Sequence, residues 1–332
     1  MPISRAAAHL GNNRARDTGR RCACIVTPER ILVTGASGFA GRHLIPVLRR
    51  QFPGALLYAD RFDLTDHAAI DATIRALRPD ACVHLGAIAV PAEARRDPDR
   101  AWRVNVMGTL ALARSILADA PNCRLLYVSS SEVYGTSAND PRAIDETALL
   151  APVTPYGATK AAADLAIGAM VSEGLHAIRI RPFNHCGPGQ SEDFVVSAFA
   201  RQIALIAAGR LPPVLRTGDL RPARDFLDVR DVCAAYAACL AADPDRCPPG
   251  TILNLASGTP RAIGDIARDL CALAKIAPTI EPATDRLRAG EIMIARGDAS
   301  RARALLNWTP AIPWARTLAD TLADWRHRLP AI

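Results

Sequence analysis

The chain has 332 residues, half of them apolar, which is enough for a large core in one domain or in one domain with a smaller lobe. Its net charge of +7 comes from dispersed arginines, so we expect no nucleic-acid partner, and its apolar runs are too short for a membrane span. The nine cysteines show no paired spacing, so we expect neither a disulfide framework nor a metal site.

Residues 1–28 differ in composition from the rest of the chain. The segment is rich in arginine and lacks an apolar run of the length found in secretory signals. We therefore expect a basic, disordered tail that takes no part in catalysis, on a protein of the cytoplasm.

From residue 29 onward, strand-like apolar runs alternate with longer helical patterns. This alternation predicts an α/β fold with a Rossmann-type, doubly wound parallel sheet. The predicted strands cover 31–34, 56–59, 82–85, 125–128 and 177–180, and the predicted helices cover about 39–50, 66–77, 100–118 and 156–172. After residue 182 the alternation of strands and helices becomes less regular and is interrupted by Pro and Gly clusters. We assign 29–182 to the sheet domain, with returning segments at about 225–262, and 183–328 mainly to a smaller interleaved α/β lobe.

A glycine-rich turn lies between the first predicted strand and the first helix. Gly35, Gly38 and Gly41 are spaced G-x-x-G-x-x-G. Glycine is needed where a turn is tight and where backbone approaches a pyrophosphate, and the following helix N-terminus offers free N–H groups to phosphates. The turn therefore predicts a dinucleotide site that also includes Phe39, Ala40 and Arg42.

The end of the second predicted strand bears on the choice of dinucleotide. Asp60 lies at the expected spacing for a carboxylate on the adenosine ribose, which favours NAD. Arg61 and Arg42 are placed to hold a 2′-phosphate, which favours NADP. Asp63 and Leu64 are placed to reach the adenine edge, although this stretch is also typical of a helix N-cap. The residues leave both NAD(H) and NADP(H) open.

Tyr156 and Lys160 form a Tyr-x-x-x-Lys pair, which places both side chains on one face of the predicted helix. A nearby ammonium lowers the pKa of a phenol and makes it a usable acid or base. Lys160 and Lys275 are the two lysines among the 40 basic residues, so a retained lysine indicates a chemical role. Ser130 follows the fourth predicted strand, where its hydroxyl can bind a reacting oxygen.

Together the glycine turn, Ser130 ahead of Val133-Tyr134-Gly135, and the Tyr156/Lys160 pair resemble the extended short-chain dehydrogenase/reductases. The resemblance covers about 29–328. It implies a Rossmann domain with a sugar-nucleotide lobe, a Ser130–Tyr156–Lys160 triad, and a homodimer or homotetramer paired through the helices at 100–118 and 156–172. It also implies a cofactor site that extends to Leu85, Gly86, Ala87 and Asn105.

The second half resembles the GDP-mannose branch of that family, through segments 181–190, 194–197, 201–203, 218–231 and 287–291. By this resemblance Asn184 contacts the sugar diphosphate, Arg224 the phosphates, and Arg288 with Glu291 the nucleoside end. For the two arginines, ion pairs with Asp225 or Glu291 are the alternative. The full set of implied substrate residues is Ser130, Ser131, Asn184, Val195, Arg201, Arg224, Arg288 and Glu291.

The branch contains dehydratases and reductases, and we expect the reductase chemistry. The segment 38–41 resembles the reductase form, and the lobe after Gly250 is compact. We predict NAD(P)H-dependent reduction of the C4 ketone of a GDP-4-keto-6-deoxyhexose. Glu132, a possible base at C5 of the sugar, leaves a GDP-mannose 4,6-dehydratase open, and a nucleotide-sugar 4-epimerase is a further alternative. A non-catalytic NAD(P)-sensing regulator is the alternative of another class, against which the intact triad argues.

Overall fold

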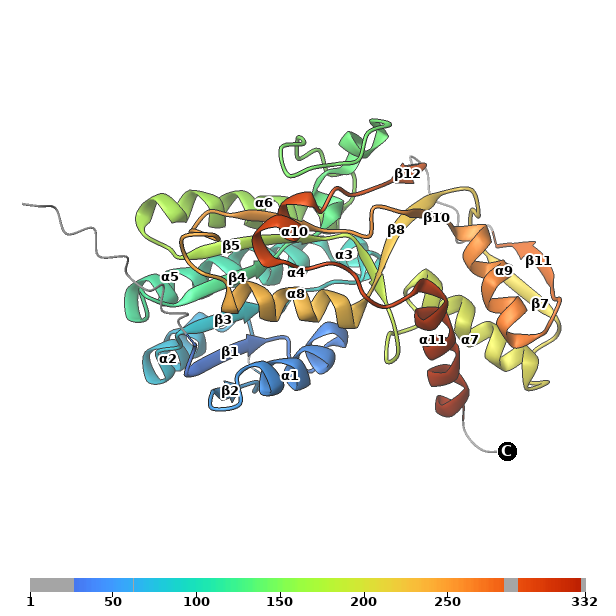
Figure 1. The fold of residues 1–332 in the computed structure, drawn as a ribbon, viewed down its shortest axis with the longest axis horizontal. Coiled ribbons are helices and arrows are strands. Elements are labelled where there is room, and N and C mark those ends of the chain that lie inside the picture. The colour runs from blue at the N-terminus through green and yellow to red at the C-terminus, as the bar shows by residue number, and fades with distance from the viewer. Residues whose placement is uncertain (1–26, 62, 284–291, 330–332) are drawn as a thin grey trace, which may run out of the picture.

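The structure is a computed structural model that describes residues 27–61, 63–283 and 292–329, and its centre is a six-stranded parallel sheet (Figure 1). The strand order is β2-β1-β3-β4-β5-β9, which confirms the predicted α/β fold. The strands are β1 Arg30–Thr34, β2 Leu56–Tyr58, β3 Ala81–His84, β4 Arg124–Val128, β5 Ala177–Pro182 and β9 Ile252–Leu255. The chain reverses direction across the sheet between β1 and β3, and such a switch point opens a ligand crevice at the carboxyl ends of the strands.

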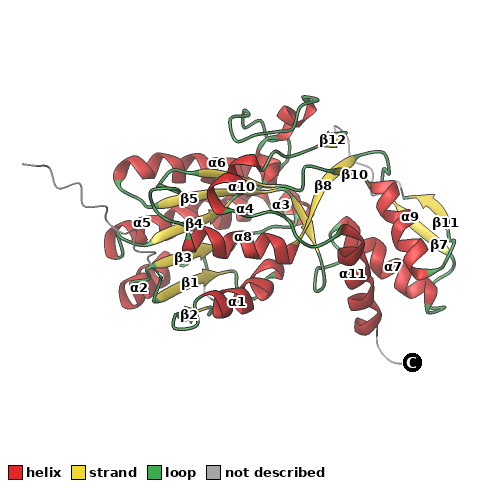
Figure 2. Ribbon diagram, viewed as in Figure 1, coloured by secondary structure: helices red, strands yellow, loops and turns green. Residues whose placement is uncertain are grey.

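Helices cover both faces of this sheet because successive side chains of a strand point to opposite faces. Ile31 and Val33 pack into one core with α1, α8 and α10, while Leu32 packs into a second core with α2, α5 and α6 (Figure 2). The helices are α1 Phe39–Gln51, α2 His67–Leu77, α3 Pro91–Arg96, α4 Pro98–Trp102, α5 Thr109–Asp119, α6 Pro155–Met170, α8 Val229–Ala241 and α10 Ser300–Leu306. Short 3-10 turns cover Ser131–Val133, Gly135–Asn139 and Val171–Glu173.

The helix predicted over 100–118 is divided in the structure. A π-helical turn, Arg103–Gly108, separates α4 from α5. Its Asn105 side chain is fully buried and bonds to the backbone N–H and carbonyl of Ile88, at 2.7 and 3.1 Å, and to Thr159 Oγ1 at 3.0 Å. The widened turn is therefore stabilised by partners that lie 17 and 54 residues away.

The smaller lobe is built around β8 (Ala223–Asp228), with β6, β10 and β12 beside it. Its core contains Phe199, Ile266 and Leu318 from three helices that pack on one another. The remaining elements are β6 Asn184–Cys186, α7 Val195–Ala207, β7 Val214–Thr217, β10 Pro260–Ala262, α9 Ile263–Ala274, β11 Thr279–Pro282, β12 Ile294–Ala295 and α11 Trp314–Arg328. Within the described residues, none of the helices combines the length and apolar character that crossing a membrane requires.

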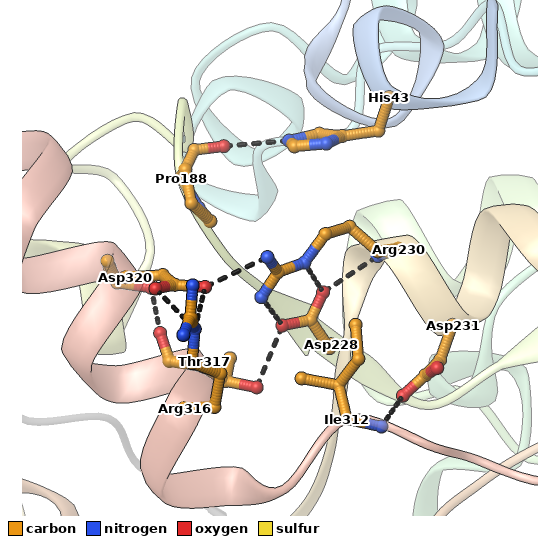
Figure 3. Close-up of polar contacts among 10 residues, drawn as sticks. His43, Pro188, Asp228, Arg230, Asp231, Ile312, Arg316, Thr317 and Asp320 are labelled. Atoms are coloured by element: carbon orange, nitrogen blue, oxygen red, sulfur yellow. Dashed lines mark hydrogen bonds and ion pairs between the residues drawn. The ribbon is translucent and has the colours of Figure 1, made fainter. Parts of the chain in front are cut away.

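Polar contacts join the two lobes where β8 leads into α8 (Figure 3). Asp228 accepts hydrogen bonds from the Arg230 guanidinium and, at 2.8 Å, from Thr317 Oγ1 of α11. Arg230 also pairs with Asp320 of α11 at 2.8 Å. Because Asp228 is buried, these bonds are shielded from water and hold α11 against the start of α8.

Candidate active site

The glycine turn after β1 leaves no room for side chains. Gly35 has φ +69°, and a Cβ there would lie 2.8 Å from the backbone nitrogen of Gly86. A Cβ on Gly41 would lie 2.5 Å from the carbonyl oxygens of Gly35 and Ala36. No side chain caps the N-terminus of α1 within the described chain, and its first turn carries no acidic residue. This bare, positively polarised turn fits the pyrophosphate of a dinucleotide.

Residues from three neighbouring loops close around this turn. Gly86 N–H donates to Thr34 Oγ1 at 3.1 Å, and the Leu85 N–H donates to the Thr34 carbonyl at 3.2 Å. A Cβ built on Gly86 would lie 2.9 Å from the Leu64 side chain, so Leu64 packs against the loop after β3. Ala87 is the next residue of that loop. The structure therefore brings together the predicted cofactor residues of the loops after β1, β2 and β3.

The three charged residues predicted after β2 are exposed. Asp63 accepts hydrogen bonds from the backbone and hydroxyl of Thr65, which hold the pKa of its carboxyl below the usual value. Asp60 and Arg61 lie beside one another on the loop. Arg42, from the first turn of α1, donates to the Gly189 carbonyl at 2.8 Å. The buried Asn105 supports the loop after β3 through Ile88, as described above.

Gly35→Ala is expected to weaken NADPH binding about tenfold or more, because the new Cβ meets backbone atoms and the positive φ strains any other residue. Gly54→Ala is the matched control, since a Cβ at Gly54 has no atom within 4 Å. NADPH fluorescence titration measures both, and equal affinities for the two variants would show that the turn does not hold the cofactor.

The predicted triad residues lie just after the carboxyl end of β4 and in the first two turns of α6. Thr154 caps α6 by accepting from the Gly157 N–H at 2.9 Å, which sets the helix so that Tyr156 lies in its first turn. The half-buried Tyr156 lies near the Ser130 hydroxyl and the Glu132 carboxylate. Burial and the Glu132 carboxylate raise the pKa of Tyr156, and the Ser130 hydroxyl lowers it, with a net increase above the usual value. The phenol therefore holds its proton at neutral pH.

Lys160 is buried one turn beyond Tyr156. Its Nζ donates to the Val128 carbonyl at 2.5 Å and lies 4.5 Å from the ring centroid of Tyr127. Burial lowers the pKa of Lys160 to about 7, although the Asp164 carboxylate acts to raise it. The sequence predicted that this amine lowers the pKa of Tyr156; in the structure the amine faces β4 and burial of the phenol dominates.

Lys160→Met is expected to change how stability depends on pH. The folded-state pKa of about 7 lies below the unfolded value near 10.4, so the unfolded chain binds more protons between these pH values. Wild-type stability therefore rises with pH by an extra contribution on the order of 1 kcal/mol per pH unit from pH 7 to 10. The Met variant lacks that contribution, so its free energy of unfolding exceeds the wild-type value by the largest margin below pH 7.

Urea denaturation at pH 6, 8 and 10 measures the difference between Lys160→Met and wild type. The exposed Lys275→Met variant is the control and is expected to show no such trend. A difference that stays constant across this range would show that Lys160 is not desolvated in the folded protein.

Glu132 lies beside the triad and is held in place by its neighbour. Thr154 Oγ1 donates to Glu132 Oε2 at 2.8 Å, and the Glu132 N–H donates to Ser130 Oγ at 3.1 Å. The carboxylate thus accepts from the same Thr154 hydroxyl that caps α6, and it raises the pKa of Tyr156. Ser131 lies between Ser130 and Glu132 in the same turn.

The predicted phosphate ligands lie on adjacent strands of the smaller lobe. Asn184 is exposed on β6, which pairs in parallel with β8, and Asn184 lies in register with Phe226. Arg224, two residues earlier on β8, bonds to the Ala223 carbonyl at 3.1 Å among its contacts. The Asp225 carboxylate is fully buried, so Asp225 is not the surface partner considered for Arg224.

The other predicted substrate residues come from α7 and from the segment before β12. Val195 begins α7, and Arg201 pairs with Glu192 while its guanidinium lies 5.9 Å from the Trp325 ring centroid. Arg201 is thus anchored to the segment just before α7 and to Trp325 of α11. Arg288 and Glu291 lie outside the described residues.

The structure also shows residues at the site that the sequence did not indicate. His185 of β6 stacks on Phe39 of the glycine turn, with ring centroids 6.2 Å apart and an interplanar angle of 8°. Thr154 had a sequence signal, because a Thr ahead of Pro155 is a typical helix N-cap. His185 had none, since its partner lies 146 residues away and depends on how the lobes meet.

Residues 31–256 match the NAD dependent epimerase/dehydratase family, which accounts for more than half of the chain. The chain belongs to the NAD-dependent epimerase/dehydratase family. This confirms the resemblance to the extended short-chain dehydrogenase/reductases, and the protein is an enzyme of this group with a nicotinamide dinucleotide as cofactor.

Within this family the chain is similar to reductases and epimerases of nucleotide sugars. GDP-6-deoxy-D-mannose reductase from Pseudomonas aeruginosa is 36% identical over 304 residues, which cover 91% of this chain and 98% of the reductase. The structure of RMD from Pseudomonas aeruginosa complexed with NADPH has a TM-score of 0.80 and 33% identity, and the match covers 91% of this chain and 100% of that one. UDP-glucose 4-epimerase from Mycolicibacterium smegmatis is 28% identical over 90% of this chain and 99% of the epimerase.

Proposed function

We propose that the enzyme reduces the C4 ketone of a GDP-4-keto-6-deoxyhexose with NADPH or NADH. The observation that carries the proposal is that hydrogen bonds through Glu132 and Thr154 tie the turn of Ser130 to the first turn of α6, which carries Tyr156. A protonated phenol at this place suits an enzyme that must give a proton to a ketone oxygen as hydride arrives. The similarity to GDP-6-deoxy-D-mannose reductase, over nearly its full length, supports the choice of GDP sugar.

The cofactor, when bound, supplies the hydride for C4. Tyr156 donates its proton to the C4 oxygen, and Ser130 donates a hydrogen bond that orients this oxygen. Lys160, one turn along α6, holds the cofactor ribose in this proposal. Holding ketone and cofactor in contact supplies much of the acceleration.

The sugar nucleotide lies across the smaller lobe in this proposal. Asn184 and Arg224 bind the diphosphate, since an arginine fork suits phosphate oxygens. Ser131, Val195 and Arg201 line the sugar and nucleotide path, and Arg288 with Glu291 bind the nucleoside end.

We further propose a homodimer or homotetramer in the cytoplasm. Trp102, Met107 and Leu165 are 44%, 46% and 59% exposed on the helices of one sheet face, which suits burial against a second copy. The seven cysteines of the described chain are free thiols, as suits a reducing compartment.

The test follows absorbance of reduced nicotinamide with GDP-4-keto-6-deoxy-D-mannose and either NADPH or NADH. Oxidation that depends on the sugar supports the proposal, and the faster cofactor is the physiological one. If neither is oxidised, GDP-mannose is incubated with NADP⁺ or NAD⁺ instead. Its dehydration, which consumes no net cofactor, would replace the reductase with a dehydratase in which Glu132 acts as the base.

A further inference from the structure

One segment of the chain, residues 184–190, lies between the dinucleotide turn and the smaller lobe. It contains β6, whose Asn184 is the proposed ligand of the sugar diphosphate. The next residue, His185, stacks on Phe39, the first residue of α1, with nearly parallel, offset rings. Phe39 itself follows Gly38, within the turn that fits the cofactor pyrophosphate. The ring pair therefore joins the two ligand sites through adjacent residues.

Two hydrogen bonds extend this contact along the first turns of α1. His43 Nε2 bonds to the Pro188 carbonyl at 2.8 Å (Figure 3). Arg42 donates to the Gly189 carbonyl, also at 2.8 Å. His43 also meets Phe39 edge-on, with centroids 5.5 Å apart. The side chains that follow the glycine turn thus hold the backbone that follows β6.

The same segment is held from the opposite side by the smaller lobe. The Gly189 N–H donates to Asp324 of α11 at 2.8 Å, and Arg328 donates to the Gln190 carbonyl at 3.2 Å. Ser197 of α7 donates to that carbonyl at 2.9 Å. Segment 184–190 is therefore clamped between α1 and the two helices of the smaller lobe.

His185 is suited to a neutral ring stack. Its Nδ1 lies 3.1 Å from the Phe183 carbonyl, and its own carbonyl accepts from Gln190 at 3.0 Å. Burial lowers the pKa of His185, and nearby His43 lowers it further, against the opposing effects of the Phe183 carbonyl and Asp228. A neutral imidazole that donates from Nδ1 packs on a phenyl face without the cost of burying a charge.

We propose that His185 is a positioning residue. Its stack on Phe39 fixes the position of β6 relative to the dinucleotide turn, so that the ketone and the cofactor meet at the reactive distance. The proposal rests on the proposed function. A displacement of about 1 Å between reacting groups is enough to cost on the order of 100-fold in rate. Each ligand keeps its own contacts when the stack is lost, so turnover falls while the separate affinities stay.

His185→Ala and His185→Phe test this, with the exposed His176→Ala as the control for a histidine far from the site. Titration calorimetry gives the Kd of NADPH and of GDP separately, and cofactor oxidation gives kcat. We expect His185→Ala to lower kcat about 10- to 100-fold with both Kd values within about threefold of wild type. His185→Phe retains the ring and should keep kcat within about threefold, as should His176→Ala.

Phe39→Leu removes the other ring of the stack, and we expect its kcat to fall in the same way. This variant tests the proposal even if His185→Ala does not fold. An unchanged kcat in the folded variants overturns the proposal. So does a His185→Ala variant whose NADPH or GDP affinity falls by as much as its kcat, because His185 then contacts a ligand directly. Wild-type protein that binds NADPH and GDP but reduces no 4-keto GDP sugar contradicts the proposed function itself, and the positioning role falls with it.

Discussion

Tyr156→Phe is expected to lower turnover by about 10²- to 10⁴-fold while NADPH binding stays within about threefold. The substitution removes the phenolic hydroxyl, whose raised pKa keeps it protonated at neutral pH. No water-derived acid at neutral pH replaces a positioned proton donor of this kind. The ring remains, so the first turn of α6 and its Thr154 cap should be unaffected.

The measurements are kcat from cofactor oxidation and Kd from NADPH fluorescence. Tyr236→Phe is the matched control. Tyr236 lies on α8, is fully buried in the core against the sheet and has no proposed part in the reaction. Its kcat should stay close to wild type. Turnover by Tyr156→Phe at the wild-type rate would remove Tyr156 from the mechanism, and a loss of NADPH binding would assign it to the cofactor site alone.

The site residues that the sequence predicted share a common property. The glycine turn and the Tyr156/Lys160 pair are local patterns, and each places its side chains through one turn or one helix. Their geometry therefore needs no knowledge of distant contacts. His185 and Arg42 differ, because their partners Phe39 and Gly189 lie 146 and 147 residues away. Those contacts depend on the relative position of two lobes, which no local pattern encodes.

The same distinction applies to the fold. The strands β1, β3, β4 and β5 were predictable because a buried parallel strand is a continuous apolar run. The sixth strand, β9, was not predicted as a strand and fell only within the returning segment at about 225–262. The π-helical turn was not, since Asn105 is held by Ile88 and Thr159 rather than by its own helix. The last segment was assigned mainly to the smaller lobe, yet Ala302 of α10 and Trp308 pack in the core of the large sheet. α10 is too short for its apolar face to reveal its partner.

Asp225→Ala is expected to lower the free energy of unfolding by about 3–5 kcal/mol, the largest stability effect that we predict. The Asp225 carboxylate is fully buried on β8. It accepts from the N–H and hydroxyl of Ser257 at 2.8 and 2.6 Å, from the Gly258 N–H at 2.8 Å and from the Gly297 N–H at 3.2 Å. Removing it leaves the backbone N–H groups of Ser257, Gly258 and Gly297 without this acceptor, and each buried donor left unpaired costs about 1–3 kcal/mol.

Asp140→Ala is the control for the same change at an exposed ion pair, Asp140–Arg142, and should shift stability by less than about 1 kcal/mol. Urea denaturation gives both values. The Asp225 bonds join β8 to the loop after β9 and to the segment that returns toward α10, so the two lobes depend on one carboxylate. Arg224 is the preceding residue, and a variant that still folds should therefore bind GDP more weakly. A loss below about 1 kcal/mol with unchanged GDP affinity would show that the three segments are held together without Asp225.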